Sequence, residues 1–300
     1  MSTRPSLRSR VLRRIVSAMK NTEPIEATVE AAARGEVDGR PAPQPPRSAM
    51  RGVVAEVRDL AGTNVHVLRP RAREPRFAVL FLHGGGYIEE SHTGVWQLVT
   101  RFVRRLDAEV WVPAYRLAPR QTAAVTVPRM RDVYAAVLAQ WSRERIAVIG
   151  DSAGGGLALA VVQEAQAAGV SVPALLGLFA PWVDLRMERP EERDTRDDPM
   201  LDYGRLSAAA RAYAGELPLT DSRVSPVLGD LRQLPRTWVI TGTDDVLVHQ
   251  SRALVAAMAE AGSSVTYLED AHMMHVHVML PISEGRAALA RFESELASLA

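Results

Sequence analysis

A serine stands in the pentapeptide Gly150-Asp151-Ser152-Ala153-Gly154, between an apolar run and an alanine-rich run. The apolar run Arg145–Ile149 predicts a buried strand, and the following run Gly155–Gln166 predicts a helix. A G-x-S-x-G pattern between a strand and a helix indicates a sharp, strained turn that presents the serine hydroxyl outside the fold. Ser152, at a helix N-terminus, is therefore a candidate nucleophile.

A second glycine-rich segment follows another predicted strand, Phe77–Leu82, and reads His83-Gly84-Gly85-Gly86-Tyr87. Backbone N–H groups in such a run are not shielded by side chains. Aimed at a developing oxyanion they stabilise it, and the loss of one donor typically costs about 3 kcal/mol. The N–H of Ala153 would complete such a hole. A tight turn or a phosphate cradle is the other interpretation, but no G-x-x-x-x-G-K-[ST] pattern follows.

A serine nucleophile needs a base, and the base needs a carboxylate that orients it. Where the serine occupies such a turn, the chain order is serine, acid, histidine. After the strand predicted at Arg236–Thr241, Asp244 and Asp245 both offer a carboxylate. We favour Asp245, which lies one step before the apolar run of the next helix.

The end of the last predicted strand offers three histidines as the base: His272, His275 and His277. We favour His275, with His272 second. The H-x-x-H-x-H spacing also raises a metal site, but no Glu or Cys completes a zinc pattern nearby, so we expect no metal. The chemistry predicted here needs no cofactor. The remaining histidines belong to no such group and are expected to be surface or satisfied residues: His66, His92 and His249.

Strands and helices alternate through the rest of the chain. Further strands are predicted at Gly52–Val57, Asn64–Leu68, Glu109–Val112, Ala174–Phe179 and Ser264–Leu268, and further helices at Gly94–Leu106, Pro128–Trp141, Val248–Ala261 and Glu284–Ser298. The first two strands are close enough to pair antiparallel. The later alternation predicts an α/β fold with a parallel sheet and helices on both faces. The candidate residues all fall at carboxyl ends of strands, where sites form in such sheets.

Two regions interrupt this alternation. Ser6–Lys20 places apolar residues at helical spacing between arginines, which predicts a helix docked on the protein; a helix lying on an anionic membrane surface is the alternative. The apolar residues are Val11, Leu12, Ile15, Val16 and Met19. A short helix at Ile25–Arg34 and a proline-rich connector at Arg40–Arg47 follow. The charged, non-periodic stretch Leu185–Asp198 and a helix near Gly204–Ala214 stand where a lid could arise.

Composition excludes several classes of function. The chain has 300 residues and is 47% hydrophobic, which suits one large α/β domain. Its 36 basic and 35 acidic residues give no case for nucleic-acid binding. No cysteine is present, so disulfides and thiolate metal sites are excluded. We expect no stable membrane span and a cytoplasmic location, because no apolar run is long enough and no secretory signal is recognised.

Six motifs occur in one order: HGGGY (83–87), YRLAP (115–119), GDSAGG (150–155), PWVDL (181–185), GTDDVL (242–247) and MHV (274–276). In this set the chain resembles the hormone-sensitive-lipase-like branch of α/β-hydrolase fold esterases, from roughly Gly52 onward. The resemblance implies a mostly parallel eight-stranded central sheet with helices on both faces and a helical cap. It implies a cap built from residues 1–48 and 185–214, and a catalytic domain from 49–184 and 215–300.

The resemblance also implies roles for matching residues. By this resemblance, Ser152 stands at the motif position of the nucleophile, Asp245 at that of the triad acid and His275 at that of the base. The oxyanion donors would be Gly85, Gly86 and Ala153, with Gly84 supporting the turn. Candidate pocket walls, for which core packing is an equal expectation, are Tyr87, Trp96, Trp182, Met200 and Tyr203. The chain departs from the family pattern at Ile88-Glu89-Glu90-Ser91-His92, at Arg120 and at Val276-His277.

The predicted function is serine carboxylic ester hydrolysis through a Ser-His-Asp triad and an acyl-enzyme. A lid over the pocket would favour small to medium acyl chains. An amidase or a deacetylase acting on an acetylated small molecule is the alternative, with the same triad. A ligand-binding protein of this fold would be expected to have a broken triad. The expected partner is a small-molecule ester, and the expected state is a monomer or a homodimer.

Overall fold

The computed structural model describes residues 4–300 except 21–24, 35–45, 61 and 195–197. An eight-stranded sheet in the order β1-β2-β4-β3-β5-β6-β7-β8 runs through its centre. The strands are β1 (Val53–Leu60), β2 (Thr63–Pro70), β3 (Phe77–Leu82), β4 (Ala108–Pro113), β5 (Ile146–Asp151), β6 (Leu175–Phe179), β7 (Arg236–Gly242) and β8 (Val265–Asp270). The β1–β2 and β2–β4 pairs are antiparallel, and the other pairs are parallel. The predicted α/β-hydrolase fold is confirmed.

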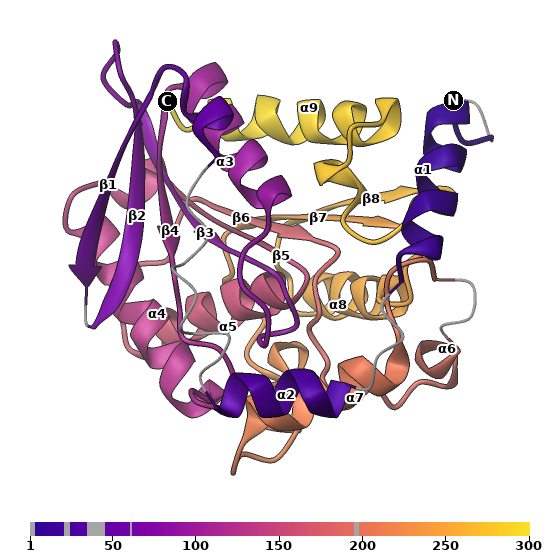
Figure 1. Ribbon diagram of the computed structural model, residues 1–300. Coiled ribbons are helices and arrows are strands. Elements are labelled where there is room, and N and C mark those ends of the chain that lie inside the picture. The colour runs from indigo at the N-terminus through magenta and orange to yellow at the C-terminus, as the bar shows by residue number, and fades with distance from the viewer. Residues whose placement is uncertain (1–3, 21–24, 35–45, 61, 195–197) are drawn as a thin grey trace.

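Helices cover both faces of the sheet (Figure 1). One face carries α3 (Thr93–Leu106) and α9 (Ser283–Ala297), and the other carries α4 (Ala123–Leu138), α5 (Ala153–Ala167) and α8 (Val248–Glu260). Every residue of β3, β4, β5 and β6 is buried for this reason. These strands therefore read as continuous apolar runs instead of alternating ones.

Helix α4 begins five residues earlier than predicted. The predicted start was Pro128, and proline does favour the first position of a helix. In the structure Pro128 lies inside the helix. The turn before it is held by burial of Ala123, Thr126 and Val127 against the sheet.

In the described part of the chain, four more helices lie outside the sheet layers: α1 (Leu7–Ala18), α2 (Ile25–Ala33), α6 (Pro190–Arg193) and α7 (Tyr203–Ala214). Figure 1 shows α2 beside α7, below α5 and α8, and α1 beside β8 and α9. The short α6 within the charged stretch was not predicted. Most of the predicted connector Arg40–Arg47 lies outside the described residues; Arg47 opens a short 3₁₀ turn, Arg47–Met50. The division into cap and catalytic segments stays a prediction.

Helix α1 is present as predicted and is docked on the protein, but through its polar side. Ser6 donates two hydrogen bonds to the Glu284 carboxylate, at 2.6 and 3.1 Å. The buried Ser9 hydroxyl contacts Met273 Sδ, and Arg13 forms an ion pair with Asp244. Three of the five apolar residues expected to dock the helix are exposed instead: Val11, Ile15 and Met19. Within the described part of the chain, no helix is long and apolar enough to cross a bilayer.

Candidate active site

Ser152 occupies the turn between β5 and α5 with φ 53° and ψ −123°, a conformation that a non-glycine residue rarely adopts. Its backbone N–H donates to Phe179 O at 2.8 Å, which fixes the turn against the end of β6. A Cβ at Gly154 would collide with the carbonyl oxygens of Leu82 and His83. The glycine therefore lets the turn pack directly on the end of β3, where the second glycine-rich segment begins.

Asp245 and His275 follow the carboxyl ends of β7 and β8 and meet there. His275 Nδ1 lies 2.8 Å from Asp245 Oδ2, and the other carboxylate oxygen accepts from Leu247 N at 2.9 Å. Both side chains are buried. Burial by itself lowers the pKa of His275, but the charge and hydrogen bond of Asp245, together with the charges of Asp198 and Asp151, outweigh burial and raise the pKa.

The other candidates for acid and base point elsewhere. Asp244 pairs with Arg13, and His272 Nδ1 lies 3.9 Å from Asp244 Oδ1. His277 Nε2 lies 2.9 Å from the Asp270 carboxylate. The three histidines thus turn toward three different aspartates. Among the residues that the structure describes, no group of three His, Cys, Asp or Glu could hold a metal ion.

The glycine loop after β3 lies against the serine turn. Gly84 N donates to Asp151 Oδ1 at 2.9 Å, so the residue just before Ser152 fixes the loop. Gly85 has φ +113°, and a Cβ there would collide with Glu89 O. Within the described ranges, the backbone N–H groups of Gly85, Gly86 and Ala153 have no hydrogen-bond partner, which leaves them available to an oxyanion.

The YRLAP motif supports this loop from behind. Tyr115 donates its hydroxyl proton to His83 O at 2.7 Å, and the two rings stack with centroids 4.3 Å apart. Burial lowers the pKa of His83 to about 4, so this ring is neutral at physiological pH. His83 Nδ1 lies 2.7 Å from Gly84 O, and because a carbonyl only accepts, Nδ1 carries the proton.

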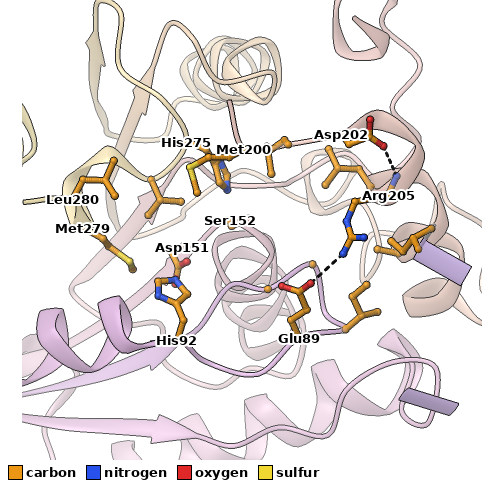
Figure 2. Close-up of a pocket in the computed structure, with 18 residues that line it drawn as sticks. Glu89, His92, Asp151, Ser152, Met200, Asp202, Arg205, His275, Met279 and Leu280 are labelled. Atoms are coloured by element: carbon orange, nitrogen blue, oxygen red, sulfur yellow. Dashed lines mark hydrogen bonds and ion pairs between the residues drawn. The ribbon is translucent and has the colours of Figure 1, made fainter. Parts of the chain in front are cut away.

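A cavity of about 300 Å³ contains both Ser152 and His275 in its wall (Figure 2). The predicted site residues Gly85, Gly86 and Met200 also line it. The rest of the wall has five charged or titratable side chains, Glu89, His92, Asp151, Asp202 and Arg205. Its other residues are apolar: Ile25, Ile88, Leu201, Leu206, Ala209, Val276, Met279 and Leu280. Residues from α2, α7, the glycine loop and the segment after β8 thus meet around the serine.

Four of the five candidate pocket walls do not line this cavity. Tyr87 is buried and stacks on Tyr213, with ring centroids 3.6 Å apart. Trp182 belongs to the same aromatic cluster, with its ring centroid 5.9 Å from that of Tyr87. Trp96 packs edge-on against His66 on the other side of the sheet. Tyr203 is half-buried and packs against the core. The three fully buried rings contribute more apolar burial in the core than they would at a cavity mouth.

Sequence reasoning missed three charged or titratable side chains of the cavity wall: Glu89, His92 and Arg205. Arg205 of α7 forms an ion pair with Glu89 of the glycine loop at 3.3 Å, drawn as a dashed line in Figure 2. His92, expected to be a plain surface or satisfied residue, lines the cavity and accepts from Gly94 N at 3.1 Å. Glu89 and His92 stood in the stretch that departs from the family pattern, which was the available signal.

Asp198 is a further missed residue, with no sequence signal beyond its charge. Its Oδ1 accepts from Met200 N and Leu201 N, both at 2.8 Å. Its Oδ2 accepts from Val246 N at 2.9 Å, next to Asp245. Burial, and then the charge of Asp245, raise the pKa of Asp198. One buried carboxylate thus ties the cavity wall at Met200 to the loop that carries Asp245.

The site combines a serine at a strained strand-to-helix turn with a glycine loop and a buried Asp–His pair. This combination is typical of hydrolases with the α/β-hydrolase fold. The comparison with known families agrees. The family described as alpha/beta hydrolase fold matches residues 79–279, and the chain belongs to it.

Named relatives narrow this class. A putative acetyl-hydrolase, LipR of Mycobacterium tuberculosis strain H37Rv, is 30% identical over 241 residues, covering 79% of this chain and 78% of that protein. An acetyl-hydrolase of Streptomyces hygroscopicus is 33% identical over 228 residues, covering 74% and 75%. A hormone-sensitive lipase from a metagenome library has a solved structure that matches with a TM-score of 0.83 and 25% identity, over 100% of this chain and 98% of that one. The predicted family and class, a carboxylesterase- or lipase-like hydrolase, are confirmed.

Proposed function

We propose that the protein is a serine carboxylic ester hydrolase in which Ser152, His275 and Asp245 form the catalytic triad. The observation that carries the proposal is the cavity that contains Ser152 and His275, while Asp245 binds the opposite nitrogen of the same histidine at 2.8 Å. The Asp245 carboxylate accepts a hydrogen bond from Nδ1–H of neutral His275, which leaves the lone pair on Nε2. Nε2 then acts as the general base on the cavity side.

The first half-reaction forms an acyl-enzyme. His275 removes the Ser152 hydroxyl proton as the oxygen attacks the ester carbonyl, and Asp245 stabilises the imidazolium that results. The carbonyl oxygen becomes an oxyanion against the N–H groups of Gly85, Gly86 and Ala153. His275 then gives its proton to the alkoxide of the leaving alcohol, which departs as the C–O bond breaks.

The second half-reaction repeats these steps with water. His275 removes a proton from water as the oxygen attacks the acyl carbonyl, the oxyanion forms again, and the proton passes to Ser152 Oγ as the acid leaves. Asp151 does not move a proton in either half-reaction. Its carboxylate instead holds Gly84 N, and thereby the oxyanion loop, in register with the serine turn.

Cavity size supports small to medium acyl esters. About 300 Å³ lies at the lower end of the roughly 300–1,000 Å³ range of small-molecule sites. Apolar side chains such as Ile88, Leu206 and Leu280 suit a short hydrocarbon chain. The cytoplasmic location and the monomeric or homodimeric state stay predictions.

The test is hydrolysis of p-nitrophenyl esters from acetate to decanoate by wild type and Ser152→Ala. We expect the highest kcat/KM at short to medium chains, and loss of activity in the variant on every ester. Ser207→Ala, on α7 and away from the cavity wall, is the control for a serine substitution. Full rates in Ser152→Ala would refute the nucleophile, and a maximum at decanoate would refute the proposed chain length.

Removal of an acetyl group is the second candidate function, because two relatives are named acetyl-hydrolases. The same triad would cleave an acetyl ester or an acetamide. Comparison of p-nitrophenyl acetate with p-nitroacetanilide separates the two bonds. Turnover of the ester alone supports the esterase, whereas a comparable kcat/KM on the anilide would support an amidase.

A further inference from the structure

The outward face of α1 carries an apolar stripe that no other part of the described protein covers. Leu7, Val11, Ile15 and Met19 follow one another at four-residue spacing, with 69%, 49%, 50% and 76% of their surface exposed. Four of the nine large exposed apolar side chains in the described chain are thus on this one helix. A grouped apolar face of this kind marks an interaction surface.

The same helix concentrates the basic charge of the chain. The first twenty residues of the chain, which include α1, contain five arginines, one lysine and no acidic residue, although the whole chain carries a net charge of only +1. Arg8, Arg10 and Arg14 are exposed and make no ion pair with any described residue. The outward face therefore combines aliphatic side chains with uncompensated positive charge.

The inward face explains why the stripe points outward. Ser6 binds Glu284, Ser9 contacts Met273, Arg13 pairs with Asp244, and Lys20 Nζ donates to Asp198 O at 3.0 Å. These contacts hold the helix in a fixed rotation, so the apolar residues cannot turn toward the core without breaking them. The exposure of the apolar stripe therefore follows from the way in which the helix is docked.

This surface lies at the same edge of the sheet as the cavity. Asp244 and Met273 belong to the segments that follow β7 and β8 and lead to Asp245 and His275. Ile25, the first residue of α2, lines the cavity. A flat partner bound to α1 would therefore lie at the edge of the sheet that holds the cavity.

We propose that the outward face of α1 docks the protein on an anionic lipid surface, and that esters dissolved in that surface are its substrates. Aliphatic side chains enter the acyl boundary while arginines bind anionic head groups, which is how amphipathic helices lie on a bilayer. A second copy of the chain fits less well, because pairing two such faces would bring their arginines together without a counter-charge. The substrate class rests on the proposed function; the docking itself does not.

Co-sedimentation of the full chain with vesicles tests the docking. We expect binding to vesicles of equal phosphatidylglycerol and phosphatidylcholine, weak binding to pure phosphatidylcholine, and release at about 1 M salt, where charges are screened beyond about 3 Å. Val11→Ser/Ile15→Ser and, separately, Arg8→Gln/Arg10→Gln/Arg14→Gln should each weaken partitioning by roughly tenfold or more.

Matched controls use exposed residues of other elements. Val57→Ser/Leu228→Ser removes two exposed apolar side chains, and Arg71→Gln/Arg104→Gln/Arg105→Gln removes three exposed charges. Both should bind vesicles like wild type. Equal losses in the control and α1 variants would overturn the proposal, as would the absence of vesicle binding. A doubled mass in light scattering that Val11→Ser/Ile15→Ser abolishes, without vesicle binding, would assign the face to a second copy.

Hydrolysis of p-nitrophenyl acetate without vesicles separates this proposal from the proposed function. The α1 variants should hydrolyse it at the wild-type rate, which also shows that they fold. An inactive wild-type protein that still binds anionic vesicles would refute the esterase and leave the docking intact. The wild-type protein should hydrolyse a p-nitrophenyl ester dispersed in vesicles faster when the vesicles contain phosphatidylglycerol. Equal rates with and without phosphatidylglycerol would overturn the substrate class.

Discussion

The two sides of the cavity are built differently. On the strand side, Ser152, Asp245 and His275 are buried and held by backbone amides and tight glycine turns. On the helix side, the wall comes from α2, α7 and the stretch around Asp198, and is joined to the glycine loop by an ion pair between Arg205 and a 56%-exposed Glu89 side chain. The contrast suggests that the reaction is fixed by rigid local geometry, whereas the fit of the substrate depends on adjustable contacts between distant segments.

Substitution of Asp245, the proposed triad acid, should give the largest effect. In Asp245→Asn the amide can donate to His275 Nδ1, which favours the wrong tautomer, and kcat/KM should fall on the order of 10⁴-fold. Asp244→Asn weakens the partly exposed pair with Arg13, which lies outside the Asp245–His275 contact, and should stay within about twofold of wild type. The measurement is kcat/KM on p-nitrophenyl butyrate. Equal losses in the two variants would contradict the difference between the adjacent aspartates.

Glycine substitutions separate strain from oxyanion binding. Gly85→Ala should lower kcat by about 10²–10³-fold with little change in KM, because a displaced loop no longer aims its N–H groups at the oxyanion. Gly52 also has a positive φ, of +76°, but lies in open space. Both variants should lose stability by about 1–3 kcal/mol from backbone strain. If Gly52→Ala lost as much activity as Gly85→Ala, strain alone would explain the result.

Asp198 joins the two sides of the cavity, and its substitution should have an effect of intermediate size. Asp198→Asn places an amide against Val246 N or Met200 N, so we expect a roughly tenfold drop in kcat/KM, equivalent to about 1.4 kcal/mol. The negative charge of Asp198 helps to raise the pKa of His275. The base must be neutral, so wild-type activity is lost as pH falls through this raised pKa, and the variant should remain active to lower pH.

The pH–rate profile of kcat/KM measures this shift. Asp202→Asn is the control, because Asp202 caps α7 and lines the cavity without bonding the Asp245 loop. Its acid midpoint should match wild type. An unshifted midpoint in Asp198→Asn would leave Asp198 a purely structural role.

The ion pair on the helix side should matter least. Glu89→Gln and Arg205→Gln should each change the free energy of unfolding by less than about 1 kcal/mol, because the Glu89 carboxylate is largely hydrated and the pair gains little over that hydration. For this chain length that corresponds to a melting-temperature shift of about 3 °C or less. A coupling energy above about 2 kcal/mol in the double-mutant cycle would show that the helix side is as firmly fixed as the strand side.

The same contrast explains which features could be predicted from sequence. The strands and the helices on the sheet were predictable because burial on both faces leaves apolar runs in β3, β5 and β6. The Ser152 turn and the glycine loop were predictable because close backbone contacts restrict the residue types to glycine. His275 and Asp245 followed from chain order and motif resemblance.

The helix side was not predictable by these routes. Asp198 bonds Val246, 48 positions away, and Arg205 bonds Glu89, 116 positions away, so neither contact leaves a local pattern. Aromatic residues were misassigned because size and apolarity suit a pocket wall and a core equally; Tyr87 and Trp182 lie in the core. The rotation of α1 depends on Arg13 and Ser9 finding partners near β7 and β8, which periodicity does not reveal.

Labelling with a fluorophosphonate probe tests the central claim most directly. Folded wild-type protein should take up one probe, and peptide mass analysis should place it on Ser152. His275→Ala should label far more slowly, whereas His272→Ala, which removes a half-exposed ring beside Asp244, should label at the wild-type rate. Absence of label on Ser152 in the folded protein, or equal labelling of His275→Ala and His272→Ala, would contradict the assignment of Ser152 as a nucleophile activated by His275.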